Sequence, residues 1–189
     1  METWHDAGVD DRALVDAIRA GDRDAFGMLV ELETHAIYRI CLRILGRPHD
    51  AEDVTQEAFV AAFRSARGYR GDGPPRAWLA RIATRLAFRR LTQRRPTLEI
   101  DAVTGHLSED AAIEPQHVVI EAERRDEVRR AVVSLPEPYR EVVALRFFGE
   151  LSLAEVADAT GRPVNTVKTQ LRRGLDRLRR HLGPPEARR

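Results

Sequence analysis

The sequence lacks most of the residues that build covalent or metal-held frameworks. Cys41 is the only cysteine, so no disulfide bond can form within the chain. The histidines are scattered without the spacing of metal ligands, and no nucleophile–histidine–acid pattern is present. We therefore expect no metal site, no cofactor and no catalysis by this chain. Because Cys41 shares the apolar stripe of a predicted helix, we expect it to pack in the core rather than to sense redox state.

Long apolar runs are missing as well. No stretch approaches the ~20 apolar residues of a membrane-spanning helix. The amino-terminal segment is acidic where a secretory signal would be apolar. We expect a cytoplasmic protein that does not insert into a membrane. The glycine-rich segment at Gly68, Gly71 and Gly73 has neither the Gly-Lys-Ser/Thr sequence nor the preceding strand of a nucleotide-binding loop, which argues against nucleotide binding there.

Lysine is almost absent, since Lys168 is the only one among 31 lysines and arginines. Arginine suits paired hydrogen bonds to phosphate and guanine, although a GC-rich genome favours arginine codons as well. The net charge of +1 conceals blocks of opposite sign. Residues 76–95 hold seven arginines and no acid, residues 161–189 hold nine basic residues and two acids, and residues 97–127 hold nine acids and two arginines. This segregation favours nucleic-acid binding, with solvated helix faces as the alternative.

Apolar residues recur at helical spacing and nowhere alternate strictly, which predicts an all-α fold. The pattern covers residues 12–96, lapses over the acidic residues 97–117 and returns over residues 118–182. We expect two small helical domains joined by a flexible acidic linker. The tails, residues 1–11 and 183–189, carry no clear pattern.

Glycine and proline residues divide the first domain into three predicted helices. Gly46 and Pro48 are expected to end the first, and Asp50 to cap the second. The glycines and prolines of residues 66–75 predict a loop. An arginine-rich third helix follows and ends at Pro96, with Trp78, Leu79, Ile82, Leu86 and Leu91 expected to point inward.

The second domain ends in a predicted helix-turn-helix. Ser152 and Glu155 form a capping box that begins a short helix, and Gly161 ends it. Pro163 then opens a long last helix, the position of the helix that enters the major groove of DNA. At 100° per residue, this helix has an apolar stripe opposite a basic face, so it can pack and meet DNA at once. An ordinary amphipathic helix with a solvated basic face is the alternative.

Several segments, in order, resemble regions of one protein family. Residues 50–59, Asp-Ala-Glu-Asp-Val-Thr-Gln-Glu-Ala-Phe, resemble region 2.2 of sigma factors. Residues 77–83, Ala-Trp-Leu-Ala-Arg-Ile-Ala, and the arginine-rich helix around them resemble regions 2.3 and 2.4. Residues 135–148, 151–157 and 165–174 resemble region 4. Their order and spacing resemble the extracytoplasmic-function (ECF) subfamily of the sigma-70 family of RNA polymerase sigma factors.

The resemblance covers about residues 12–182 and implies a factor that binds core RNA polymerase and directs transcription initiation at promoter DNA. The implied polymerase contacts are Asp50, Glu52, Asp53, Gln56 and Glu57. The residues implied to open and read the −10 element are Tyr69, Gly71, Asp72, Gly73, Arg76, Trp78, Arg81, Arg85 and Arg89. The residues implied to read the −35 element are Asn165, Thr166, Lys168, Thr169, Arg172, Arg173 and Arg177. Because the subfamily is usually held by a dedicated inhibitor, an anti-sigma factor is a further expected partner.

Some of these residues have a second interpretation or depart from the family pattern. Tyr69 is a candidate for stacking on a flipped base, whereas Trp78 is expected mainly in the core. The acids of residues 50–57 also suit a capped, solvated helix start. Arg85 and Arg89 stand where many family members have asparagine or aspartate, and Gln170 stands where arginine is frequent. The promoter sequence therefore cannot be transferred from relatives.

A stand-alone helix-turn-helix regulator with a helical sensor domain is the rival interpretation. It predicts a dimer surface or ligand pocket and leaves residues 50–59 and the arginine-rich helix unexplained. A weaker rival is a protein-interaction domain whose basic helix faces are solvated and bind no nucleic acid. If the initiation-factor interpretation holds, we expect the free protein to bind DNA poorly, because each basic patch is small and acidic segments can mask it.

Overall fold

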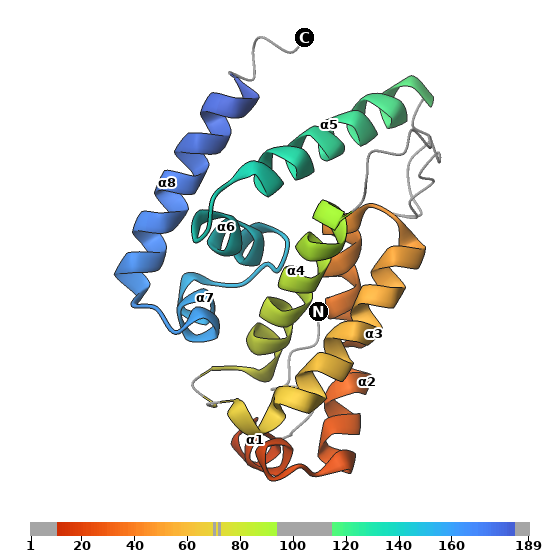
Figure 1. Cartoon of the computed structure of the whole chain (residues 1–189), viewed down its shortest axis with the longest axis vertical. Coiled ribbons are helices and arrows are strands. Elements are labelled where there is room, and N and C mark those ends of the chain that lie inside the picture. Colours follow the sequence, from red (N-terminus) through yellow and green to blue (C-terminus); the bar gives the residue numbers. More distant parts are fainter. Residues whose placement is uncertain (1–10, 70, 72, 94–114, 184–189) are drawn as a thin grey trace.

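The computed structural model describes residues 11–69, 71, 73–93 and 115–183, and the described part is helical without strands. The all-α prediction is confirmed, with two domains that follow one another along the chain (Figure 1). The first consists of α1 (Asp11–Ala20), α2 (Arg23–Leu45), α3 (Pro48–Ser65), the 3-10 turn η2 (Ala66–Gly68) and α4 (Pro75–Gln93). The second consists of α5 (Pro115–Ser134), α6 (Tyr139–Phe147), α7 (Leu153–Thr160) and α8 (Val164–Leu182). None of the described helices is long and apolar enough to cross a membrane.

The core of the first domain lies where α2, α3 and α4 pack against one another. Of the α4 residues predicted to point inward, only Leu79 is fully buried, and Trp78 and Ile82 are half-buried. Alanines take the closest positions instead, because the helices approach too closely for larger side chains; these are Ala51, Ala58, Ala62, Ala77, Ala80, Ala83 and Ala87. α1, which the pattern did not resolve as a helix, packs against η2, and its Leu14 and Ile18 are buried.

The junction between α2 and α3 differs from the sequence prediction. Gly46 does end α2, in the left-handed conformation at φ 76°, and its N–H donates to the Leu42 carbonyl. Pro48, however, begins α3 instead of ending α2, since a first-turn position needs no N–H from proline. Asp50 is therefore not the cap. It lies in the first turn of α3, where its negative charge interacts favourably with the positive end of the helix dipole.

Cys41 is fully buried on α2, which confirms the expected core position. Burial raises the pKa of its thiol from 9.0 to about 11. We expect the native protein to carry about a hundredfold less thiolate than an exposed cysteine at neutral pH, because the pKa lies about two units higher. Iodoacetamide should therefore modify Cys41 slowly in buffer and rapidly in urea, as followed by intact mass. Rapid modification of the folded protein would contradict the burial.

α5 starts at Pro115, within the last residues of the expected linker. The capping box is confirmed: Ser152 N–H donates to Glu155 Oε2 over 2.7 Å, and Glu155 N–H donates to Ser152 Oγ over 3.2 Å. Gly161 ends α7 at φ 66°, and Pro163 precedes α8, as predicted. The expected linker up to residue 114 lies outside the described residues, as do residues 1–10 and 184–189.

Gly174 lets α8 approach α6 closely. A Cβ atom there would lie 2.8 Å from Cγ2 of Val143, which is itself buried. Helix propensity alone favours Gly174→Ala by about 1 kcal/mol, but overpacking a core costs about 1–3 kcal/mol. We expect the clash to dominate and the alanine variant to unfold at lower temperature. Thermal denaturation followed by circular dichroism checks the sign, with Gly27→Ala, where nothing lies within 4 Å, as the control that should not destabilise.

Candidate nucleic-acid interface

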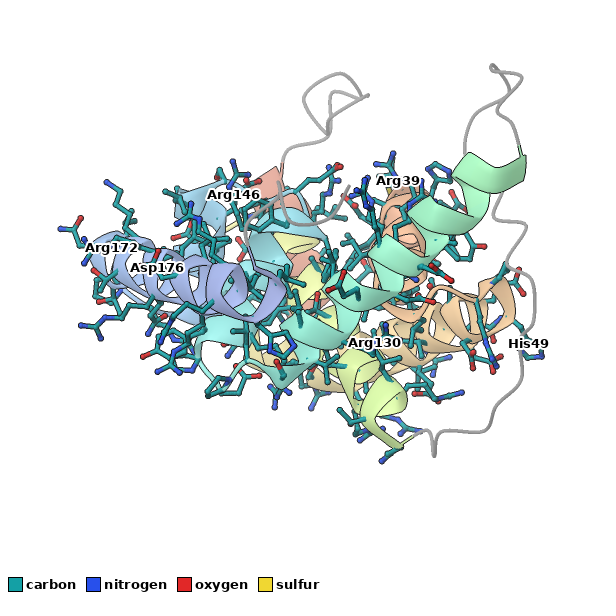
Figure 2. All side chains as sticks on the ribbon, turned by 90° about the horizontal axis from the view of Figure 1, so that it is seen from above. Arg39, His49, Arg130, Arg146, Arg172 and Asp176 are labelled. Atoms are coloured by element: carbon teal, nitrogen blue, oxygen red, sulfur yellow. The ribbon has the colours of Figure 1, made fainter. Side chains whose placement is uncertain are left out.

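The outward face of α8 is basic and open. It belongs to the second helix of the predicted helix-turn-helix, which packs through Val167, Gly174 and Leu178. The seven residues predicted to read DNA are all exposed: Asn165, Thr166, Lys168, Thr169, Arg172, Arg173 and Arg177. Figure 2 shows Arg172 at the outer end of the molecule, far from α2. Such a row can offer paired donors to base edges and phosphates.

Two further details of α8 bear on recognition. Arg177 lies 5.1 Å over the ring of Tyr139, so its guanidinium is held against the domain at the edge of the face. Asp176, the acid of this helix, lies one turn after Arg172 on the same face and pairs with Arg179 at 2.9 Å. Val164, which the 100° spacing places on the apolar stripe of α8, is 38% exposed because it lies in the first turn.

The acids at the start of α3 share one arginine that sequence analysis did not single out. Arg90 of α4 lies 3.6 Å from Asp50, 3.8 Å from Asp53 and 2.8 Å from Glu57. Glu52 and Gln56 of the same predicted set are exposed. The arginine-rich sequence of α4 gave no sign of which of its arginines turns toward α3. Arg90 therefore pairs with three of the five side chains, and Glu57 remains exposed together with Glu52 and Gln56.

An apolar surface continues this acidic one. On α3, Val60 is 50% exposed and Phe63 is 42% exposed, and Val60 follows Gln56 by one helical turn. On α2, which packs beside α3, Met28 and Leu32 are 45% and 44% exposed. Large apolar side chains so exposed on adjacent helices are typical of a protein–protein contact.

The loop before α4 is closed in this conformation. The ring of Tyr69 stacks on Trp78 with centroids 4.7 Å apart, and its hydroxyl donates to the Gly73 carbonyl. Tyr69 is only 7% exposed, so its ring faces Trp78 and not solvent. A Cβ atom on Gly73 would lie 2.7 Å from the Cβ of Asp158, which places the second domain against the loop. Gly71 adopts φ 76°, and Asp72 lies outside the described residues.

The predicted row of α4 arginines is divided. Arg81 donates from Nε to Glu141 over 2.9 Å and from Nη1 to the Ala159 carbonyl over 2.9 Å, and both partners belong to the second domain. Arg76 faces the buried Glu33 at 3.8 Å. Arg85 and Arg89 are exposed. The structure therefore brings two of these four side chains into intramolecular contacts and leaves two open.

Comparison with known proteins gives the family. The sigma-70 region 2 model matches residues 29–97, and the sigma-70 region 4 model matches residues 125–178, together more than half of the chain. The chain is 34% identical to the ECF RNA polymerase sigma factor SigW of Bacillus subtilis, over 87% of this chain and 92% of that one. The chain belongs to the ECF sigma factors. It is also 31% identical to the ECF RNA polymerase sigma-E factor of Escherichia coli K12, over 92% and 95% of the two chains.

Solved structures share the fold of this chain. CnrH, in complex with the cytosolic domain of CnrY, superposes with a TM-score of 0.59 and 25% identity over 91% of this chain and 96% of that one. RpoE of Bartonella quintana, in complex with the anti-sigma factor NepR, superposes with a TM-score of 0.52 and 19% identity over 83% of this chain and 96% of that one. At this identity the likeness is one of fold. In this sigma factor, α3 and α4 lie in the region 2 match, and α6, α7 and most of α8 lie in the region 4 match.

Proposed function

We propose that this sigma factor divides promoter recognition between its domains. α3 docks on core RNA polymerase through its acidic and apolar surface, the loop before α4 and the outer face of α4 open and read the −10 element, and α8 reads the −35 element. The observation that carries this proposal is the face of seven exposed residues on α8, four of them basic, in a helix-turn-helix whose first helix is capped. A helix so presented suits the major groove, where base edges are distinguishable.

The docking part of the proposal follows from charge and exposure on α3. Glu52 and Gln56 face solvent beside Val60 and Phe63, so the surface combines acceptors with apolar area. Its complement is a partner surface with basic and apolar side chains. In this role the chain is a binding subunit of the polymerase and not itself an enzyme, and it works in the cytoplasm, where the polymerase is.

An inhibitory protein partner is part of the same proposal. CnrH was solved bound to a cytosolic domain of another protein, and RpoE of Bartonella quintana was solved bound to an anti-sigma factor. The exposed apolar side chains of α2 and α3 offer such a partner a surface. An anti-sigma factor that covered them would compete with the polymerase for this surface.

Reconstituted transcription tests the proposed function. Purified protein and core RNA polymerase are mixed with genomic DNA fragments, and the 5′ ends of the transcripts are mapped. We expect starts that require both components and that share two upstream elements, because α4 and α8 read DNA separately. If the starts do not depend on the chain while it shifts duplex DNA alone as a dimer, the stand-alone regulator is the correct account.

A further inference from the structure

The two domains meet through buried and half-buried charges. Glu141 of α6 is only 8% exposed and accepts hydrogen bonds from Arg81 Nε over 2.9 Å and from Arg162 Nη2 over 2.7 Å. One of these arginines belongs to each domain. A carboxylate that holds a guanidinium of the other domain in this way fixes how α6 lies against α4.

A second acid, Glu150, reaches further across the contact. It lies 2.6 Å from Arg43 Nη2, and Arg43 Nη1 donates to the Phe148 carbonyl over 3.1 Å. Glu150 is the only non-glycine residue at positive φ, 56°, among the residues that the structure describes. Glycine takes that conformation without strain, whereas a side chain makes it unfavourable. The turn thus carries a carboxylate where backbone geometry alone favours glycine.

The positive charges of three arginines of the first domain act on this carboxylate. The hydrogen bond from Arg43 lowers the pKa of Glu150, and the positive charges of Arg43, Arg39 and Arg76 lower it further. The Nε atoms of Arg39 and Arg76 are buried and donate no hydrogen bond in the described part of the chain, and Arg76 Nε lies 3.8 Å from Oε2 of the buried Glu33. We call Arg39, Arg43 and Arg76 the arginine site. Glu33 and Glu150 leave some of its donors without a hydrogen bond, which suits an anion with more oxygens.

We infer that the arginine site binds phosphates of promoter DNA and that Glu150 occupies it as a phosphate substitute while the domains are closed. The site adjoins the α4 surface proposed for the −10 element, because Arg76 lies in the first turn of α4 and Arg81 is one to two turns on. Arg39 and Arg43 are on α2 and outside the set of residues proposed for promoter reading. The inference rests on the proposed DNA binding of the first domain.

This arrangement makes DNA and the second domain compete for one surface. The closed domains cover Arg43 and Arg81, whereas the reading face of α8 stays open. The two basic surfaces are well separated, with Arg39 and Arg172 toward opposite sides of the molecule in Figure 2. The −10 surface is therefore masked in part, since Arg85 and Arg89 stay exposed, and separating the domains exposes Arg81 and the arginine site.

DNA binding by the full-length chain, without polymerase, tests the inference. Fluorescence anisotropy is measured with a short labelled single strand and with its duplex, over a series of salt concentrations. Glu150→Gln keeps the shape of the side chain and removes the competing charge, so we expect affinity for DNA to rise about threefold, the scale of an exposed ion pair. Glu31→Gln, on the exposed surface of α2, is the control and should change nothing.

Arginine substitutions then separate a phosphate site from a simple domain contact. In the Glu150→Gln background, Arg39→Gln with Arg43→Gln should abolish the gain in affinity. It should also lower the slope of log K against log salt by about 1.4 for the single strand, about 0.7 per phosphate contact. For the duplex the expected change is about 1.8, about 0.9 per contact. Arg64→Gln, an exposed residue of α3, is the control for the removal of positive charge.

Each outcome decides the question. If Glu150→Gln separates the domains in small-angle scattering but the arginine substitutions leave the salt slope unchanged, the contact is structural and the inference is wrong. Unchanged DNA affinity in Glu150→Gln overturns it as well. Failure of the proposed function is distinguishable, because it appears as transcription that does not depend on the chain, while the anisotropy needs no polymerase.

Discussion

Replacing Glu52 and Gln56 with arginine is expected to abolish co-elution of this sigma factor with core RNA polymerase. Both side chains are exposed, so the fold tolerates arginine, which is a good helix former. Against a basic partner surface, like charges cost several kcal/mol, and we expect affinity to fall at least about a hundredfold. Size-exclusion chromatography of the mixture and a fluorescence titration of labelled sigma factor measure this loss.

The matched control is Asp16→Arg with Ala20→Arg on α1. It adds the same positive charge at the same four-residue spacing on exposed positions, and it breaks only the weak ion pair of Asp16 with Arg19, which lie 3.8 Å apart. This variant should co-elute like the unmodified chain. If both variants fail to co-elute, the loss reflects net charge, and if neither fails, docking does not use the exposed face of α3.

Two substitutions on α8 should weaken promoter binding in different ways. Asn165→Ala removes a side chain suited to a base edge, so we expect a loss of about 1–3 kcal/mol at the cognate −35 sequence and relaxed preference at one base pair. Arg173→Ala should weaken binding to all sequences alike and lower the salt slope by about 0.9, because it removes a phosphate contact. Anisotropy of the holoenzyme with promoter duplexes measures both effects.

Arg179→Ala is the control for this pair, because Arg179 is exposed on α8 but is paired with Asp176. It should leave base preference unchanged. Holoenzyme formation should be unaffected in all three variants, since α8 lies outside the proposed docking surface. A uniform loss for Asn165→Ala across sequences would show that this residue does not read a base.

Local sequence signals were enough for most of the fold. Ser152, Glu155 and Gly161 mark the ends of α7 by side-chain and backbone chemistry within a few residues, and the structure has them as predicted. Pro48 was assigned to the wrong helix because proline is compatible both with the end of one helix and with the first turn of the next. α1 was missed because a single short helix carries few apolar positions to count.

The candidate site was predictable only where it depends on one helix. The exposed face of α8 follows from its own periodicity, so the seven residues lie as expected. The partners of Arg81 and Arg90 do not follow from the periodicity of one helix. Hydrogen-bonded acids that lie 33 and 60 residues away in the chain decide which arginines of α4 are engaged. The stacking of Tyr69 on Trp78 likewise depends on how the loop folds back on α4.

The scarcity of lysine has a chemical consequence for this sigma factor. Lys168 is the single side-chain amine, and it is exposed on the face of α8 proposed to read DNA. Acylating reagents, and any enzyme that acetylates lysine side chains, therefore have one side-chain amine as a target, where acylation removes a positive charge next to the groove. An amine-reactive fluorophore, coupled at a pH high enough for both amines to react, labels Lys168 on the recognition helix as well as the α-amino group. No substitution is needed for this labelling. Promoter DNA should then protect Lys168 from coupling, so that its reactivity reports occupancy of the −35 element.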